Sequence, residues 1–277
     1  MDFCQYFSNM SLRESVKKQS DIPLMLAKHV FSSEFKGIDS NMVFSPLSIQ
    51  IVLGLIPTGS KGQTMEQLLS FFNLNSIEEV NSLSSWLVAN VLVDGSPRGG
   101  PRLSVANGAW VDRTLSFKHS FKQIMDNVYK AASAYVDFQN KPDEVAKEVN
   151  KWAEEKTNGL IKEILPPGAV HNMTRLILAN ALYFKGEWVK KFNASETKDY
   201  EFYLLNGTSI KAPFMTKNRL STVAAAYDGF KVLGLPYKYG NDNRRFCMYF
   251  ILPDANDGLS TIWEKMTSEP DFLNHHL

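Results

Sequence analysis

The sequence predicts a protein of the α+β class. Amphipathic helical segments and short apolar strands are interleaved along the chain, and no internal repeat occurs. Strands and helices do not alternate strictly, as they would in a doubly wound parallel sheet. Hydrophobic residues make up 44% of the 277 residues and charged residues 21%, so the chain can bury a large apolar core. Length alone allows one large domain or two of average size.

The N-terminal segment predicts one helix and one strand. A helix is expected over residues 23–35, because apolar residues recur there at helical spacing. The members of this stripe are Leu24, Ala27, Phe31 and Phe35. The apolar residues 41–44 predict a short strand after the helix.

A second helix is expected to begin at Ser45 and Pro46 and to end at Pro57. Serine accepts hydrogen bonds from the free amides of a first helical turn, and the fixed φ of proline suits that turn. Residues 47–56 are apolar on nearly every face, which predicts a buried helix. Since proline lacks an amide donor, Pro57 is expected to stop it.

A third helix is predicted by a capping box, in which Thr64 is the N-cap and Gln67 reaches back to it. An apolar stripe at helical spacing follows, made of Met65, Leu68, Leu69 and Phe72. Residues 96–101, with the sequence Ser-Pro-Arg-Gly-Gly-Pro, then form the clearest loop of the chain.

The middle of the chain predicts a strand followed by two helices. The strand is expected at residues 105–111. The first helix follows from an apolar stripe made of Phe117, Phe121, Ile124, Met125 and Val128. The second begins at Pro142 and ends at Asn158-Gly159, which favours a left-handed stop. Its expected buried face is Val145, Val149, Trp152 and Ala153.

The C-terminal part predicts further strands and a last helix. Residues 176–184 form a near-continuous apolar run, which is typical of a strand that is covered on both faces and central in its sheet. Shorter strands are expected at 223–225, 231–235 and 246–252. A final helix is expected at 259–267.

Composition argues against several classes of partner. Lys and Arg number 30 against 29 Asp and Glu, so the net charge of +1 does not favour nucleic acid. No apolar run approaches the roughly 20 residues that span a bilayer, so no membrane partner is expected. The N-terminus lacks a signal-peptide pattern, and Cys4 and Cys247 are the only two cysteines. These features predict a cytoplasmic protein.

The sequence contains no pattern of catalytic or metal-binding residues. The five histidines form no HExxH motif or other zinc spacing, so no metal and no cofactor are expected. No GxSxG turn is present for a serine nucleophile. Residues 54–61 resemble a phosphate loop but place Ser60 before Lys61, the reverse of the required order, so a tight turn is expected there. We predict no catalytic residues and no enzymatic activity.

Asn180 is the most informative polar residue, because it lies in the middle of an apolar strand. A buried amide without partners costs about 1–3 kcal/mol, so hydrogen-bond partners are expected. Ser45 and Ser48, at the start of a buried helix, are candidates. We expect a structural network rather than a catalytic one, and such a network can still serve function if it holds a sheet that must open.

Several segments resemble serpins, in the order that the family has, from about residue 20 to the C-terminus. The most specific is 180–188, Asn-Ala-Leu-Tyr-Phe-Lys-Gly-Glu-Trp, which is similar to strand 3 of the main serpin sheet. Other segments are similar to the entry into helix B, the following turn, helix F and the paired strands of the second sheet. These are 41–48, 59–64, 150–152 with 157–161, and 235–237 with 246–253. The residues 238–245 look most like the plant branch of the family.

The resemblance implies a single serpin-like domain over residues 1–277, incomplete at its C-terminus. Serpins present a reactive-centre loop that inserts into the main sheet as a new strand after a protease cleaves it. Carried over by position, Ser45, Ser48 and Asn180 would lie in the shutter beneath the opening sheet. Trp188 would lie at the breach, where the loop first enters.

The sequence ends at Leu277, before the part in which serpins carry the hinge, the reactive-centre loop and its scissile bond. We therefore expect a non-inhibitory serpin-family protein without a reactive centre. The alternative is a suicide-substrate inhibitor of serine or cysteine proteases, if a longer product supplies the loop, and a protease is a partner only in that case. Since a flanking strand would be missing, the exposed edge of residues 176–184 is expected to favour self-association.

Overall fold

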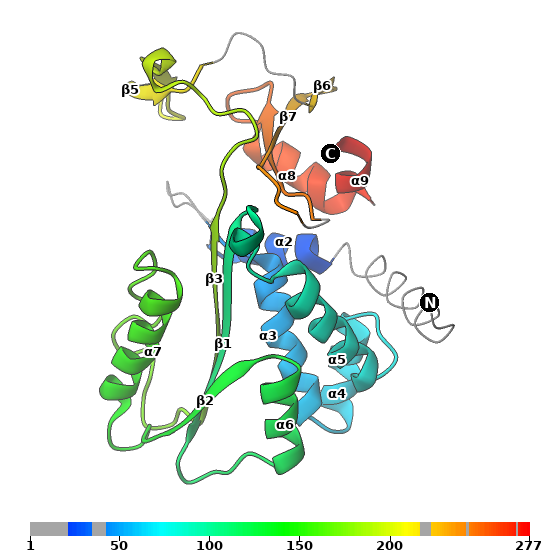
Figure 1. The fold of residues 1–277 in the computed structure, drawn as a ribbon, viewed down its shortest axis with the longest axis vertical. Coiled ribbons are helices and arrows are strands. Elements are labelled where there is room, and N and C mark those ends of the chain that lie inside the picture. The colour runs from blue at the N-terminus through cyan, green and yellow to red at the C-terminus, as the bar shows by residue number, and fades with distance from the viewer. Residues whose placement is uncertain (1–21, 35–42, 217–222, 242–243, 270) are drawn as a thin grey trace. The chain divides into compact units, whose positions relative to one another are not determined.

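The computed structural model describes residues 22–34, 43–216, 223–241, 244–269 and 271–277 (Figure 1). The chain forms two compact units, which are described separately. Unit 1 contains the described residues up to Asp94 together with Arg102–Phe184, and unit 2 contains Gly95–Pro101 and the described residues from Lys185 onward. Because the chain passes between the units more than once, a single domain over residues 1–277 stays a prediction.

Unit 1 combines α-helices with a three-stranded sheet (Figure 1). Its described helices are α2 (Ile22–Glu34), α3 (Pro46–Gly59), α4 (Gln63–Phe71), α5 (Ile77–Trp86) with the π-helical turn Leu87–Val91, α6 (His119–Asn127) and α7 (Pro142–Lys156). Its strands are β1 (Arg102–Asp112), β2 (Ala131–Val136) and β3 (Leu176–Lys185). Helix α5 was not predicted, although Ser76 caps it by accepting a hydrogen bond from the Glu79 amide.

The sheet of unit 1 has the order β2-β1-β3. Strands β1 and β2 run parallel, in a register from Asn107 opposite Ala131 to Asp112 opposite Val136. Strand β3 lies at the end of this order, so the prediction that it is central is wrong for the described residues. Ala181 is buried, but most residues of β3 are only partly covered. An apolar run indicates that the faces of a strand are covered by packed elements, and it does not decide whether the strand has a neighbour at both edges.

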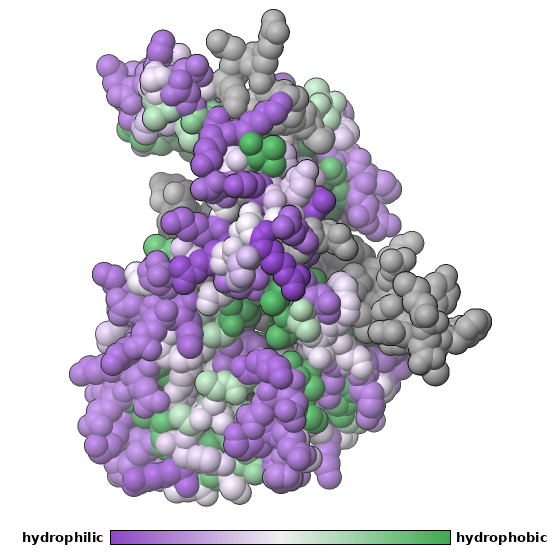
Figure 2. All heavy atoms as spheres, in the orientation of Figure 1, coloured by the Kyte–Doolittle hydropathy of each residue, from purple (hydrophilic) through white to green (hydrophobic). Residues whose placement is uncertain are grey.

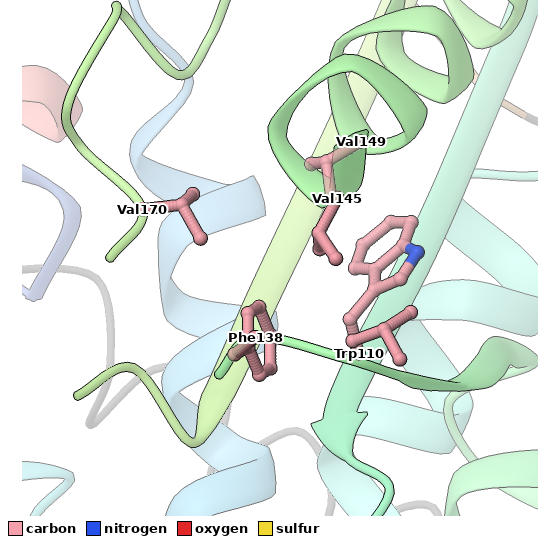
Figure 3. Packing of buried hydrophobic residues seen from close by; sticks show 6 residues of the cluster. Trp110, Phe138, Val145, Val149 and Val170 are labelled. Atoms are coloured by element: carbon pink, nitrogen blue, oxygen red, sulfur yellow. The ribbon is translucent and has the colours of Figure 1, made fainter. Parts of the chain in front are cut away.

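Helix α7 buries the apolar face that its spacing predicted. Val145 and Val149 are 4% and 0% exposed, and they belong to one cluster with Trp110, Phe138 and Val170 (Figure 3). The opposite face of the helix is charged and exposed, in keeping with the hydrophilic surface in the lower part of Figure 2. Such an amphipathic helix is held mainly by its buried side rather than by helix propensity.

Helix α7 also ends as predicted. Asn158 and Gly159 have φ values of 56° and 81°, which is the left-handed conformation. The amide of Gly159 donates to the carbonyl of Glu154 at 2.8 Å. This bond satisfies one of the carbonyls that a helix C-terminus leaves free.

Helix α3 begins as predicted but does not end at Pro57. Ser45 is the N-cap, and its Oγ accepts a hydrogen bond from the Ser48 amide at 3.2 Å. The helix then continues through Pro57 to Gly59. The expected stop is therefore wrong.

Ser60, just after the helix, helps the last turn of α3 to continue past the proline. Its Oγ donates to the Ile56 carbonyl at 2.7 Å, and its amide donates to the Pro57 carbonyl at 3.1 Å. These bonds satisfy two carbonyls at the end of the helix that would otherwise need other donors. Pro57 is itself buried, so tertiary packing also favours the continued turn.

Two predictions near α3 are also wrong. Gly62 is the N-cap of α4 and no side chain caps this helix, so Thr64 lies inside it and makes no capping box. Residues 43–45 form no strand, and Val43 is 97% exposed. Residues 41 and 42 of the predicted strand lie outside the described residues.

Unit 2 contains two small sheets and two α-helices. The hairpin sheet is β4 (Lys198–Tyr203) with β5 (Ser209–Phe214), and the second sheet has the order β6-β7-β8 (Val223–Tyr227, Phe230–Pro236 and Cys247–Pro253). The helices are α8 (Leu259–Ser268) and α9 (Phe272–His276), and short 3-10 turns lie at Ser96–Arg98 and Ala194–Glu196. The predicted strands and the helix at 259–267 are present, whereas the hairpin and α9 were not predicted.

A small apolar core holds α8 and α9 against the β6-β7-β8 sheet. Phe230 and Val232 of β7 are 0% and 2% exposed, and they cluster with Ile262 of α8 and Phe272 of α9. The ring centroids of Phe230 and Phe272 are 5.7 Å apart. Aromatic packing of this kind adds to the stabilisation that burial alone gives.

Residues 95–101, the predicted loop with its flanking glycine, form a compact segment that we call the clasp. The Gly95 amide donates to the Pro101 carbonyl at 3.1 Å and closes it. The Asn241 amide donates to the Arg98 carbonyl at 2.9 Å, so the clasp is bonded to a segment much later in the chain. A Cβ added to Gly240 would lie 2.1 Å from that same carbonyl oxygen, and only glycine permits the approach.

Candidate functional site

The amide of Asn180 belongs to a hydrogen-bonded chain across the sheet of unit 1. Its Nδ2 on β3 donates to Asn107 Oδ1 on β1 at 2.8 Å. The Nδ2 of Asn107 donates in turn to the Tyr129 carbonyl at 2.7 Å. Asn107 is 3% exposed. These two hydrogen bonds therefore link β3 to β1 and to the segment that leads into β2. Leaving their buried polar groups unpaired would cost folding free energy.

Ser45 and Ser48 are not the partners of Asn180. Both lie at the start of α3, where Ser45 caps the Ser48 amide. Ser48 is 5% exposed, and its Oγ is buried without a hydrogen-bond partner within the described ranges. The predicted pairing is wrong because the neighbouring strand offers the amide of Asn107 instead. Asn107 was not predicted as a site residue. It could have been, because it is an asparagine inside an apolar strand, 105–111, which is the feature that identified Asn180.

Tyr129 extends this network to the helices. Its side chain is 0% exposed, and its hydroxyl donates to Asn81 Oδ1 on α5 at 3.2 Å, an oxygen that also accepts from Thr58 Oγ1 on α3 at 3.1 Å. A Cβ added to Gly54 would lie 2.9 Å from the tyrosine hydroxyl, so glycine makes room for it. Burial raises the pKa of Tyr129 to about 12, against smaller opposing effects of hydrogen bonds with Ser84 and Thr58.

Alkaline pH is expected to destabilise the wild-type chain more than the Tyr129→Phe variant. The folded-state pKa of about 12 lies above the ordinary value of 10.0, so the neutral phenol stabilises the fold fully below pH 10. This contribution is lost as the pH rises from about 10 towards about 12, and its upper limit is about 3 kcal/mol. Urea unfolding of both proteins at pH 8 and pH 11.5 measures the change.

Tyr203→Phe is the control for this experiment, because Tyr203 is 72% exposed. Removing its hydroxyl should leave the pH dependence of unfolding as it is in the wild type. An equal loss of stability in the wild type and in Tyr129→Phe between the two pH values would contradict the role of the buried phenol.

Trp188 lies in unit 2 and stacks on Tyr237. The ring centroids are 4.4 Å apart with an interplanar angle of 17°, and the two residues form an antiparallel β-bridge. The Val189 amide donates to the Pro236 carbonyl at 3.0 Å beside them. A Cβ added to Gly186 would lie 2.5 Å from Tyr237 Cδ1, so glycine lets the ring pack on the backbone. Stacking and backbone pairing together hold the indole in one orientation.

A cavity of about 300 Å³ lies between α7 and β2 in unit 1. Its wall includes Trp110 and Trp152, whose rings meet edge to face with centroids 5.2 Å apart. The Nε1 of Trp110 donates to Glu148 Oε1 at 2.9 Å. No histidine or cysteine lines this cavity, and no group of His, Cys, Asp and Glu side chains suited to a metal occurs in the described part of the chain. None of the described helices is long and apolar enough to cross a membrane.

Comparison with known proteins decides the family. A family model described as "Serpin (serine protease inhibitor)" matches residues 18–276. The chain belongs to the serpin family.

Plant serpins are similar to this serpin chain over nearly all of its length. Serpin-ZX of Arabidopsis thaliana is 54% identical over 268 residues, which are 97% of this chain and 68% of the relative. The probable non-inhibitory serpin-Z5 of Arabidopsis thaliana is 46% identical over 275 residues, which are 97% of this chain and 63% of that relative. The serpin chain thus spans about two thirds of the length of these relatives.

A solved structure confirms the predicted fold. Arabidopsis AtSerpin1, in its native stressed conformation, matches with a TM-score of 0.90 and 54% identity, covering 96% of this chain and 67% of that one. The predicted α+β serpin fold and the likeness to plant serpins are therefore confirmed. The shutter role of Ser45, Ser48 and Asn180 and the breach role of Trp188 stay predictions.

Proposed function

We propose that this 277-residue serpin chain does not inhibit proteases. The observation that carries the proposal is the position of β3 at the end of the β2-β1-β3 order. Serpin inhibition requires a cleaved loop to enter the main sheet as a new strand. Such a strand needs a partner on both sides, and the described residues supply β3 on one side only.

One relative supports this proposal by its name. The Arabidopsis thaliana protein called probable non-inhibitory serpin-Z5 is 46% identical to this chain. Members of this branch are thus not all named as inhibitors. We likewise propose that the chain is not an enzyme and that it uses no cofactor or metal.

The alternative is a suicide-substrate inhibitor of serine or cysteine proteases. The high TM-score of 0.90 to AtSerpin1 in its native stressed conformation favours it, as does the 54% identity to Serpin-ZX. This function requires a longer product that supplies a reactive-centre loop, because the described strands offer no second wall for insertion. A protease is a partner only under this alternative.

Incubation with proteases is expected to give no covalent complex. The 277-residue chain is mixed in turn with trypsin-like, chymotrypsin-like and papain-like proteases, and the products are separated on denaturing gels. We expect cleavage of exposed segments and no SDS-stable band, since trapping needs both a bait and sheet insertion. A serpin of established inhibitory activity is the positive control. A stoichiometric covalent band from the 277-residue chain would overturn the proposal.

We propose a structural role for the predicted site residues. Asn180 would hold β3 to β1 through Asn107, which suits a shutter that keeps a sheet closed. Ser45 and Ser48 would act at the start of α3. The buried Ser48 hydroxyl has no hydrogen-bond partner within the described ranges, so it could bond to a further group there. Trp188, held by Tyr237, would serve as the breach residue.

The remaining proposals concern partners and compartment. The edge of β3 offers a route to self-association, because backbone groups of an edge strand can pair with another chain. The net charge of +1 gives no electrostatic reason for a nucleic-acid partner, and we propose none, nor a membrane partner. We propose the cytoplasm as the compartment, since a chain with two cysteines does not depend on an oxidising one.

A further inference from the structure

Three Asn-Gly steps occur in the chain, and they begin at Asn107, Asn158 and Asn206. In such a step the glycine nitrogen can attack the side-chain amide of the asparagine before it, because glycine carries no Cβ to obstruct the approach. The attack converts the asparagine to an acid. Its rate in the folded chain depends on how the side-chain carbonyl is held and on which hydrogen bond the glycine amide must release. The structure gives the three steps different environments in both respects.

Asn206 lies in the exposed turn between β4 and β5. The Thr208 amide donates to Asn206 Oδ1 at 3.0 Å. A bond of this kind, from a side-chain carbonyl to the amide two residues later, is an Asx turn, and it folds the side chain back over the intervening nitrogen. The Cγ of Asn206 is therefore held beside the Gly207 nitrogen. A Cβ added to Gly207 would meet no atom within 4 Å, so no other part of the described chain crowds the glycine.

The hydrogen bonds of the turn also favour the reaction. The Thr208 hydroxyl donates to Asn206 Oδ1 at 2.7 Å, in addition to the amide. Attack on Cγ places negative charge on this oxygen, and donors that already point at it stabilise the charge as it develops. The Gly207 amide donates to the Leu204 carbonyl at 3.0 Å, and this bond must open before the attack. Because it lies at the exposed end of a two-stranded hairpin, its local opening costs little free energy.

The other two steps are held more firmly. Gly159 ends α7, where its amide donates to the Glu154 carbonyl at 2.8 Å, so releasing this amide would undo the end of a packed helix. Asn158 has a φ of 56° and is part of the same left-handed stop. Asn107 is 3% exposed, and both polar atoms of its side chain are bonded within unit 1. It is therefore shielded from the water that the reaction consumes.

We propose that Asn206 is a site of spontaneous deamidation. The Gly207 nitrogen loses its proton and forms a bond to Asn206 Cγ. The bond between Cγ and Nδ2 then breaks, and the amide nitrogen leaves as ammonia with that proton. The product is a cyclic imide, and water adds to one of its two carbonyls and opens the ring to aspartate or to isoaspartate. One water is consumed and one ammonia is released, with no change in oxidation state.

The two products differ in their effect on the hairpin. Aspartate adds a negative charge but keeps an acceptor for the two Thr208 donors. Isoaspartate inserts an additional methylene into the backbone between Leu204 and Thr208, whose amide and carbonyl are now joined at 2.8 Å, so it loosens the turn. The inference uses only bonds within residues 204–208. It therefore depends neither on residues elsewhere in the chain nor on the proposed lack of protease inhibition.

Peptide mapping of the aged protein tests the site. Trypsin releases the three steps in separate peptides, 103–113, 157–162 and 199–211. The folded 277-residue chain is incubated in mildly alkaline buffer and digested briefly, and the acid forms are measured by mass spectrometry. We expect Asn206 to convert at least about threefold faster than Asn158, and Asn107 to convert slowest. In guanidinium chloride the three rates should converge. Equal conversion of Asn158 and Asn206 in the folded chain, or the same order of rates in guanidinium chloride, would overturn the proposal.

Variants of Thr208 test the contribution of its hydroxyl. Thr208→Val removes the hydroxyl but keeps the amide donor, and it should slow conversion of Asn206 at least about threefold. Thr208→Ser restores a hydroxyl and should convert as the wild type does. Conversion of Asn158 in the same samples is the internal control, since neither variant changes its bonds. A rate at Asn206 that is the same in Thr208→Val as in the wild type would show that the hydroxyl does not assist the reaction.

Discussion

Replacing Gly240 with alanine is expected to destabilise unit 2 by about 3 kcal/mol. The added Cβ would lie 2.1 Å from the Arg98 carbonyl oxygen and 2.6 Å from the Gly100 amide nitrogen. Both atoms belong to backbone, which cannot move aside as a flexible side chain can. The clasp would have to separate from residues 240–241 and lose the Asn241 hydrogen bond. Urea unfolding measures the cost, and hydrogen exchange of the Asn241 amide reports the separation.

Gly207→Ala is the control for Gly240→Ala. Gly207 lies in the β4–β5 turn with a φ of 83°, and an added Cβ would meet no atom within 4 Å. Its replacement should cost only the strain of a left-handed alanine, about 1 kcal/mol. If Gly240→Ala cost no more than this and left the exchange of Asn241 unchanged, the steric role of Gly240 would be contradicted.

Asn107→Leu is expected to destabilise unit 1 by about 3 kcal/mol. The change removes the acceptor for Asn180 Nδ2 and the donor to the Tyr129 carbonyl, and leaves both groups without their present partners. Leaving a buried polar group unsatisfied destabilises a protein by more than the average contribution of one hydrogen bond. The group has lost its hydrogen bonds to water and gains none in the folded protein. The urea midpoint of the variant against the wild type measures the effect.

A double-mutant cycle separates this network from simple loss of packing. Asn180→Leu removes the donor that Asn107→Leu leaves unpaired, so the double variant should lose less stability than the two single variants summed. Asn172→Leu, at an exposed position, is a control that should change stability little. Strict additivity between positions 107 and 180 would show that their hydrogen bond does not couple them.

Helix boundaries could be predicted from the sequence only in part. Ser45 before Pro46 marked the start of α3 correctly, because a cap depends on residues adjacent in the chain. Pro57 failed as a stop, since it is itself buried by tertiary packing and Ser60 serves two carbonyls of the last turn. Thr64 failed as a cap although its spacing to Gln67 was suitable. Local spacing suggests a cap but does not decide between competing helix starts two residues apart, here Gly62 and Thr64.

Strand pairing depends on residues that are distant in sequence, so local patterns predict it less well. The apolar run of β3 predicted the strand but not its edge position. Asn180 was recognised as a buried amide, yet its partner lies 73 positions away on β1. The β4–β5 hairpin could have been found from Asn206-Gly207, a strong turn signal between alternating polar and apolar residues. The resemblance of segments such as 180–188 to serpins predicted the overall fold, which these local patterns do not determine.

The clasp has a consequence for synthesis on the ribosome. Its Arg98 carbonyl bonds the amide of Asn241, which is translated about 140 residues later. At ordinary elongation rates this interval lasts roughly 7–30 s, far longer than a helix or hairpin needs to form. The clasp therefore lacks its hydrogen bond to Asn241 until that residue has been synthesised, although the helices before it and the strand after it are already present. Slower translation of the intervening residues 102–240 would lengthen this delay.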